Sequence, residues 1–317
     1  MPEFLTIIFN ILTSGLPCCL LAIGVFLTFR LLDFADMTAE GSFLLGASLT
    51  AASIYRGINP FVATLFGMMV GIVCGILTGV LNRVLKIPKL LSGIITLTAS
   101  MSIAMMIMGI TRPEQIFATQ IPLSLASGHQ TIYSMFYPGN EWNKLVEASV
   151  MLVVVIIMIV IVYYFFGTEY GMAIRATGMN EKMAKSQGIN TNISSITCVA
   201  ISNGLIGLAG ALYVQDALSV STVSATGYLV IGLASILIGE AIFGKRSFKN
   251  WLISIALGAI VYFTIITIAI RLGFPTELKN LLYAILITLA LCIPFFKQWI
   301  NLLISKIRGG RNRHART

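Results

Sequence analysis

Residues 145–191 read LVEASVMLVVVIIMIVIVYYFFGTEYGMAIRATGMNEKMAKSQGINT, an apolar run followed directly by a polar one. The apolar part, residues 145–166, has the length that an α-helix needs to cross the hydrocarbon core of a bilayer. The polar part, residues 168–191, contains helix-favouring alanines and is punctuated by glycines, so it predicts a short helix at a membrane surface. Such a helix is either a solvated connector or a docking element for a cytoplasmic partner.

The composition of the whole chain predicts a membrane protein. Of its 317 residues, 57% are hydrophobic and only 10% are charged, and the mean hydropathy is +0.92. Soluble domains carry about 25% charged residues. We therefore predict an all-α polytopic membrane protein with one membrane domain and no soluble domain. The net charge is +9, and the charged residues lie at the ends of the apolar runs. This position favours a positive-inside membrane topology over nucleic-acid binding.

Nine transmembrane helices are predicted from the apolar runs. They cover residues 4–29, 41–55, 61–81, 90–110, 145–166, 193–214, 227–243, 251–270 and 281–296. Basic residues cluster at 83–89 and 245–249, whereas the long loop at 111–143 is poor in them. Because basic loops stay in the cytoplasm, the N-terminus is expected outside and the C-terminus inside. Residues 1–10 lack the basic start of a cleavable signal peptide, so the first span is expected to be retained.

The two halves of the chain resemble each other. Five small or hydroxyl residues of the first half recur 186 positions later: Gly24, Thr38, Ala39, Gly41 and Gly46 correspond to Gly210, Ser224, Ala225, Gly227 and Gly232. The related spans are five apart, an odd number, so the two repeats must be inverted, as in many transporters. The expected single domain, residues 1–317, comprises repeat 1 at about 4–110, a connecting span and loop at 145–192, repeat 2 at 193–297 and a basic cytoplasmic tail at 298–317.

The repeat also nominates a translocation pathway. Polar segments at residues 33–40 and 215–226 each lead into a short span, whose N-terminus can face a cavity with the positive end of its dipole. The candidate pathway residues are Asp36, Thr38, Ser221, Ser224 and Thr226. The alternative is that these residues are ordinary helix caps and interfacial loops, because Thr38 and Ser224 are favourable N-cap residues.

The sequence argues against chemistry performed by this chain. Residues 239–245, GEAIFGK, match most of a phosphate-binding loop, but Arg246 stands where Ser or Thr is needed, and the segment ends a predicted span. The cysteines lie in apolar runs and the two histidines are isolated, so we expect neither disulfides nor a metal site. No acidic residue is expected to be buried within a span, which disfavours an ion-coupled carrier.

Two motifs resemble a known family. Residues 36–47, DMTAEGSFLLGA, and residues 171–180, GMAIRATGMN, together with Ala184 and residues 188–190, are similar to permeases of the branched-chain amino acid and ribose type. These permeases are the membrane subunits of bacterial ABC importers. The resemblance covers essentially the whole chain and is nearest to a subfamily assigned to tryptophan or tyrosine uptake. It implies a type II importer fold, like that of the vitamin B12 importer.

The resemblance also implies partners and roles. Residues 168–191 would hold a coupling helix that sits in a cleft of a cytoplasmic ATP-hydrolysing subunit, and ATP and magnesium would be used there, with no cofactor bound by this chain. A second permease copy, forming a homodimer, and an extracellular solute-binding protein or lipoprotein are implied in the bacterial plasma membrane. The coupling residues would be Glu169, Gly171, Arg175, Ala176, Gly178, Asn180, Glu181, Lys182 and Gly188.

Within this loop, Arg175, Asn180, Glu181 and Lys182 are predicted to contact the partner, and Gly178 and Gly188 to shape turns. The loop lacks the Glu-Ala-Ala run of other ABC permeases. Two other functions stay open at this point: an ion-coupled secondary transporter that works without an ATPase, and a membrane-embedded enzyme or scaffold.

Overall fold

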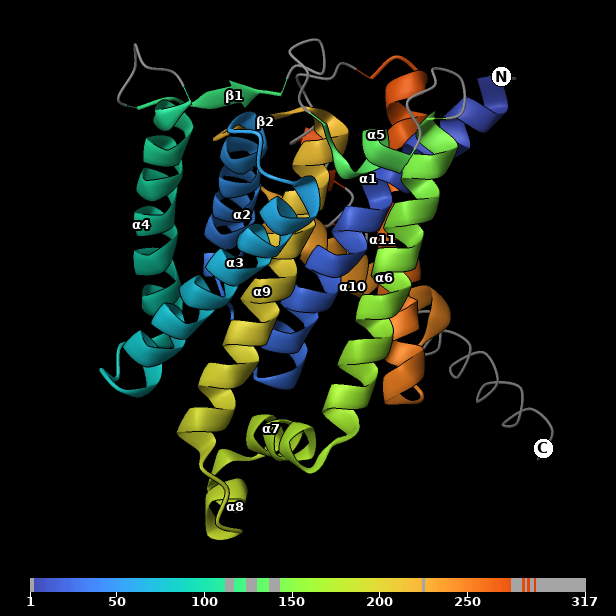
Figure 1. Ribbon diagram of the computed structural model, residues 1–317. Helices are drawn as coiled ribbons and strands as arrows, with labels where there is room; N and C mark the ends of the chain where they lie inside the picture. The colour runs from blue at the N-terminus through green and yellow to red at the C-terminus, as the bar shows by residue number, and fades with distance from the viewer. Residues whose placement is uncertain are drawn as a thin grey trace, which may run out of the picture.

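The computed structural model describes residues 3–111, 117–123, 130–136, 143–223 and 226–274, together with 281–282, 284–285 and 288. Long helices run side by side through most of the molecule, with two short strands at one end (Figure 1). Most of the predicted last span, and the whole basic tail, lie outside the described residues, as does Ser224.

The elements follow one another in two groups. The first group is α1 (Glu3–Phe26), the π-helical turn η1 (Leu27–Leu31), α2 (Thr38–Tyr55), α3 (Pro60–Arg83), α4 (Lys89–Ile110), β1 (Gln120–Pro122) and α5 (Ile132–Phe136). The second group is α6 (Asn143–Gly167), α7 (Glu169–Met179), α8 (Glu181–Ser186), α9 (Thr191–Ala217), β2 (Ser219–Ser221), α10 (Tyr228–Phe243) and α11 (Phe248–Arg271).

The prediction of an all-α polytopic membrane protein is confirmed. Six described helical segments are long and apolar enough to cross a bilayer: Ile8–Leu31, Pro60–Arg83, Lys89–Ile110, Lys144–Gly167, Thr191–Ala217 and Phe248–Arg271. The predicted short spans correspond to α2, with 18 residues, and α10, with 16. The count of nine spans stays a prediction. Within the long loop predicted at 111–143, described residues form α5 and β1, and β1 pairs antiparallel with β2.

A row of glycines brings α3 and α9 together. A Cβ atom at Gly71 would overlap the carbonyl oxygen of Asn203, and one at Gly75 would overlap that of Val199. Gly207 of α9 fits against Gly67 and Gly71 in the same way. Helices in lipid associate through close packing, so these glycines set the distance between the two backbones. Gly67, Gly71, Gly75 and Gly79 recur every four residues in the sequence, a spacing that by itself predicts a helix-packing face.

The short helices α2 and α10 each pack against the first helix of the other half of the chain. Helix α2 lies on α9, where Gly46 meets Gly207, and α10 lies on α1, where Gly232 meets Leu21 and Val25. Helices α1 and α9 also contact each other, and they run in opposite directions (Figure 1). The two halves are therefore interlocked.

Replacing Gly71 by leucine is expected to lower the thermal stability of the purified protein strongly. The added side chain has no room against the α9 backbone, and overpacking a tight contact costs about 1–3 kcal/mol or more. The melting temperature in detergent measures this effect. Met69→Leu is the matched control on the same helix, because Met69 is 63% exposed on the outer face. Equal melting temperatures for the two variants would contradict the close α3–α9 contact.

Candidate functional site: the α7–α8 helix pair and the buried polar network

The polar stretch after the fifth predicted span forms two helices instead of the single short helix that was expected. Thr168 is extended and caps α7, because its hydroxyl accepts a hydrogen bond from the Gly171 N–H at 3.2 Å. Asn180 is extended again, with φ −156°, which ends α7. Its side-chain oxygen then accepts from the Met183 N–H at 3.1 Å and so starts α8. The expectation of one helix is therefore wrong: Asn180 separates two helices, α7 and α8.

Two glycines of α7 allow close contact with the bundle. A Cβ at Gly178 would overlap the Leu31 carbonyl oxygen of η1, and one at Gly171 would overlap the Phe165 carbonyl oxygen of α6. The expectation that Gly178 shapes a turn is wrong, because it lies inside α7 and its φ is not positive. Gly188 does sit in a turn, with φ +80°. The two glycines of α7 fix how closely it docks on the membrane helices.

The charged residues of this segment divide into two groups. Glu181 accepts a hydrogen bond from the Arg83 guanidinium at 2.7 Å, so α8 is tied to the end of α3. Arg175 is only partly exposed and lies over the Phe248 ring of α11, 4.9 Å from its centroid. Both side chains have partners within their own chain, although the Glu181 side chain is still 41% exposed. Their contact with an ATPase subunit stays a prediction.

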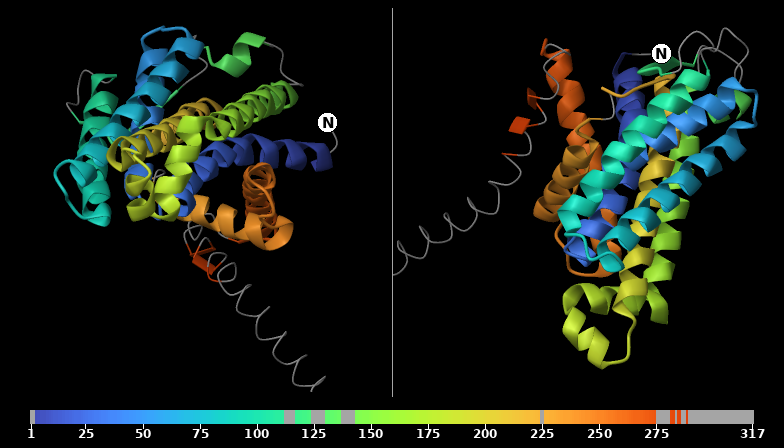
Figure 2. Two further views of the ribbon diagram at one scale, coloured as in Figure 1. Left: turned by 90° about the horizontal axis from the view of Figure 1, so that it is seen from below. Right: turned by 90° about the vertical axis from the view of Figure 1, so that its left-hand side faces the viewer.

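The outer surface of the segment is made by other side chains. Met179 is 88% exposed and Met183 is 61% exposed, and Glu169, Lys182 and Lys185 are exposed as well. Ala176 is half-buried against the bundle. The helix pair extends beyond the end of the long helices (Figure 2). Its outer face therefore combines methionines, which adapt their shape readily, with two lysines.

A buried polar network lies at the start of α2. Asp36 is 3% exposed; one carboxylate oxygen accepts from the Thr38 N–H at 2.9 Å and the other from the Asn203 amide at 2.7 Å. The Asn203 oxygen accepts in turn from the Ser42 hydroxyl at 2.7 Å. Asp36 thus accepts from the first N–H group of α2 and ties this end of α2 to the middle of α9. Asp36 lies in the connection between η1 and α2, so it is a buried acid beside the membrane helices and not one within a predicted span.

Hydroxyl groups continue this network across three helices. Thr38 of α2 and Thr78 of α3 are hydrogen-bonded at 2.7 Å, and Thr78 donates to Thr96 of α4 at 2.9 Å. All three are buried. A polar group inside a membrane bundle is costly without a partner, so this chain of hydroxyls holds α2, α3 and α4 in register.

The N-termini of α2 and α10 meet through a carboxylate. Glu40, in the first turn of α2, accepts a hydrogen bond from the Gly227 N–H at 2.9 Å, at the start of α10. The Phe43 and Tyr228 rings stack next to this contact, with centroids 4.0 Å apart. A carboxylate at a helix N-terminus is favoured by the unpaired N–H groups and by the helix dipole. Each of the two short helices therefore begins at a carboxylate of the 33–40 segment.

The predicted pathway residues have different environments. Asp36 and Thr38 belong to the buried network, whereas Ser221 pairs with Gln120 in the two-stranded sheet. Thr226 is exposed and donates to the Thr222 carbonyl at 3.3 Å, and Ser224 lies outside the described residues. The sequence reasoning missed Asn203 and Glu40. Asn203 carried a usable signal, because it is a lone amide in an apolar span.

The structure is a bundle of membrane helices in which each half packs a short helix against the other half. It has a buried polar network and a pair of helices that projects from one end, an arrangement suited to a membrane transport protein. Residues 7–291 match the family described as "Branched-chain amino acid transport system / permease component". The chain belongs to this family of transport permeases, whose members are not enzymes. It is a permease subunit of an importer, and the family implies ATP-binding partner subunits and embedding in a membrane.

Two of the three relatives described here are named as permease proteins. The chain is 36% identical to the tyrosine transport system permease protein of Clostridioides difficile, over 88% of each chain. It is 24% identical to the uncharacterized protein RP368 of Rickettsia prowazekii, over 87% of this chain and 95% of that one. It is 29% identical to the galactofuranose transporter permease protein YtfT of Escherichia coli, over 46% of this chain and 41% of that one. No solved structure matches.

Proposed function

We propose that this chain forms the translocation pathway of an ATP-driven amino acid importer and is coupled to a separate ATPase through the α7–α8 segment. The observation that carries the proposal is the docking of this segment. Gly178 lies against η1 and Glu181 binds Arg83, so α7 and α8 move with the ends of α1 and α3. A push on the exposed face of α8 is therefore transmitted to two membrane helices.

The distribution of charge supports a cytoplasmic position for this segment. Arg83, Lys182, Lys185, Lys245 and Arg246 lie on α3, α8 and the α10–α11 connection, which are at one end of the bundle (Figure 1). The N-terminus is at the opposite end. Under the positive-inside rule, the basic end faces the cytoplasm, which supports the proposed extracellular N-terminus. The proposed cytoplasmic C-terminus depends in addition on the predicted ninth span.

The packing supports the inverted repeat. If α1, α2 and α3 are exchanged with α9, α10 and α11, the observed helix pairs are reproduced: α2 on α9 becomes α10 on α1, and α3 on α9 becomes α11 on α1. We propose that repeat 1 covers about residues 4–110 and repeat 2 about 193–297, with residues 145–192 joining them. Within this arrangement, Asp36 and Thr38 hold the pathway helices in place, and Ser221 and Thr226 are the pathway groups nearer to solvent.

The proposed solute is an amino acid, and an aromatic amino acid is the first candidate. The relative named for tyrosine transport covers most of both chains, whereas the relative named for galactofuranose covers less than half of each. The proposed assembly is a homodimer of this chain with two ATPase subunits and an extracellular solute-binding protein or lipoprotein in a bacterial plasma membrane.

One observation favours an alternative, an ion-coupled secondary transporter. Asp36 is a buried carboxylate among membrane helices, and such residues carry protons or sodium ions in many carriers. Here both of its oxygens accept hydrogen bonds from protein groups, which suits a structural role. Dependence of uptake on ATP separates the two functions.

Purification of the tagged chain from its native membrane in mild detergent, followed by mass spectrometry, tests the proposal. An ATPase subunit recovered with the chain is the expected result. The solute-binding protein that accompanies them would then be screened with tyrosine and other amino acids by calorimetry. Repeated recovery of the chain without an ATPase, together with uptake that needs no ATP, would favour the secondary transporter.

A further inference from the structure

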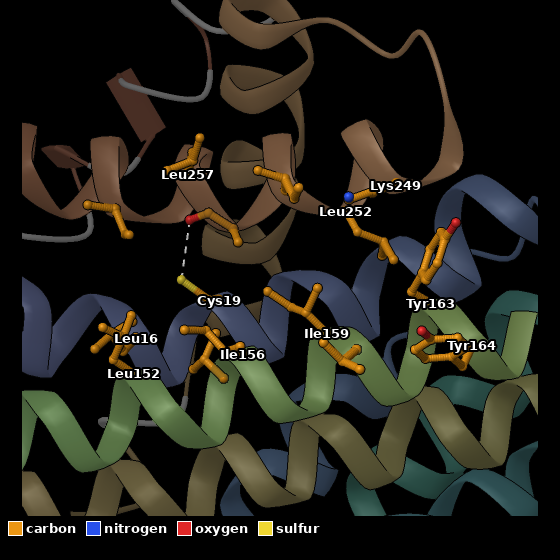
Figure 3. A pocket seen from close by; sticks show the side chains of 15 residues that line it. Leu16, Cys19, Leu152, Ile156, Ile159, Tyr163, Tyr164, Lys249, Leu252 and Leu257 are labelled. Carbon is orange, nitrogen blue, oxygen red and sulfur yellow. Dashed lines mark hydrogen bonds between the residues drawn. The ribbon is translucent and has the colours of Figure 1, made fainter.

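An apolar groove of about 510 Å³ runs along the outside of the bundle between α1, α6 and α11 (Figure 3). Its floor is made by buried side chains, among them Leu16, Cys19 and Leu252, each at most 1% exposed. Its rim is made by exposed apolar side chains on the outside of the bundle, such as Ile156, which is 51% exposed. An apolar groove on the outside of membrane-spanning helices is chemically suited to an acyl chain.

One end of the groove is polar and basic. Tyr163, Tyr164 and Lys249 lie together at this end (Figure 3). They also line a second, adjoining pocket of about 670 Å³, which Arg175 of α7 and Ser247 share. The apolar groove therefore continues into a pocket with two cationic side chains and several hydroxyl groups.

The two cations of this pocket have no carboxylate partner among the described residues. The ion pairs found there join Arg30 to Glu240 and Arg83 to Glu181. Arg175 lies over the Phe248 ring, and both residues line the pocket. Thr168 and Ser247, the N-cap residues of α7 and α11, line the same pocket, so both helix dipoles also favour an anion there.

We propose that this continuous surface binds an anionic phospholipid, with an acyl chain in the groove between α1, α6 and α11 and the phosphate at Arg175 and Lys249. Basic pockets at the inner ends of membrane helices recognise anionic headgroups in this way. Tyrosine hydroxyls at the headgroup level add hydrogen bonds, and their rings suit the interface. The proposal needs only that the chain is embedded in a membrane, and so it stands or falls independently of the transported solute.

Native mass spectrometry of the delipidated, purified protein with added lipid tests this proposal. The probes are phosphatidylglycerol, which is anionic, and phosphatidylcholine, which is not, at equal concentrations. Wild-type protein is expected to retain phosphatidylglycerol preferentially. The R175Q/K249Q variant is expected to bind it about thirtyfold more weakly, because each of the two basic residues contributes about 1 kcal/mol near a membrane surface. The matched control K182Q/K185Q loses the same charge on α8, outside the pocket, and should retain the preference.

A second pair of variants tests the groove without changing charge. Ile156→Trp fills the groove, whereas Val153→Trp adds the same ring to α6 at a position that is 55% exposed and outside the groove. Only the first should reduce lipid retention, with an unchanged oligomeric mass. The proposal is overturned by any of three results: no lipid preference in the wild type, an undiminished preference in R175Q/K249Q, or an altered oligomeric mass in Ile156→Trp, which would make the groove an interface between copies.

Discussion

Replacing Gly178 by alanine is expected to reduce ATP-driven uptake about tenfold or more while the protein still inserts in the membrane. A Cβ at this position would overlap the Leu31 carbonyl oxygen, and neither backbone can move without separating α7 from η1. Coupling between an ATPase and a permease depends on a free energy of about 1–3 kcal/mol between the two sites. Loss of this one contact is therefore enough to uncouple them. Uptake of radiolabelled tyrosine by proteoliposomes loaded with ATP measures the effect.

Gly167→Ala is the matched control for this experiment. Gly167 is the last residue of α6, and a Cβ there meets nothing within 4 Å. The control is expected to transport like the wild type, with equal amounts of protein in the membrane by quantitative blotting. Wild-type uptake by Gly178→Ala would refute the role of the α7–η1 contact. If tyrosine is not the solute, the ATPase activity of the purified complex provides the same comparison.

Replacing Asn203 by leucine is expected to destabilise the folded protein by about 3 kcal/mol. The change removes the amide donor of Asp36 and the acceptor of Ser42, and each buried polar group left without its partner costs about 1–3 kcal/mol, with more for a charged group. The apparent melting temperature of the detergent-solubilised protein, followed by size-exclusion chromatography, measures the loss.

Ser202→Ala is the reference variant, because it shows how much the melting temperature falls when one buried hydrogen bond is lost. Ser202, the neighbouring residue of α9, donates one hydrogen bond to the Gly24 carbonyl of α1 at 2.7 Å, so its loss should cost only about 1 kcal/mol. An Asn203→Leu variant that melts no earlier than Ser202→Ala would show that Asp36 is satisfied in another way. The buried network would then not be what positions α2.

Much of the fold was predictable because lipid imposes simple rules on a sequence. Residues 61–81 and 193–214 read as spans, and α3 and α9 extend them by only a few residues at each end. The spacing of Gly67, Gly71 and Gly75 predicted a packing face, because only glycine permits such close backbones. The length of an apolar run and the spacing of its small residues can both be read from one local stretch of sequence.

The site was less predictable because its contacts join distant parts of the chain. Asn180 is a loop residue by type, and only its extended backbone shows that it ends one helix and caps the next. Arg175 and Glu181 looked free in sequence, but Phe248 and Arg83 engage them from 73 and 98 positions away. Asp36 was expected to line the pathway or, alternatively, to lie in an interfacial loop, whereas in the structure it is buried and hydrogen-bonded to Asn203, 167 residues later.

These contacts explain why a short polar loop matters to the whole bundle. Gly178 touches the end of η1, and the segment that follows η1 leads directly to Asp36 and the start of α2. Lys89 of α4 donates to the Asp33 carbonyl at 3.0 Å and so holds the same segment from the other side. A displacement of α7 therefore reaches the N-terminus of α2 within a few residues of chain.

The most direct test of the account is site-specific photo-cross-linking from the exposed face of α8 in native membranes. A benzophenone amino acid at Met183, which is 61% exposed, should form an adduct with an ATPase subunit, and the same group at Leu272, 84% exposed after α11, should not. An ATPase adduct at Met183 alone is the predicted result. Recovery of the ATPase with the chain but with no adduct at Met183, or with equal adducts at both positions, would contradict the coupling role of the α7–α8 segment.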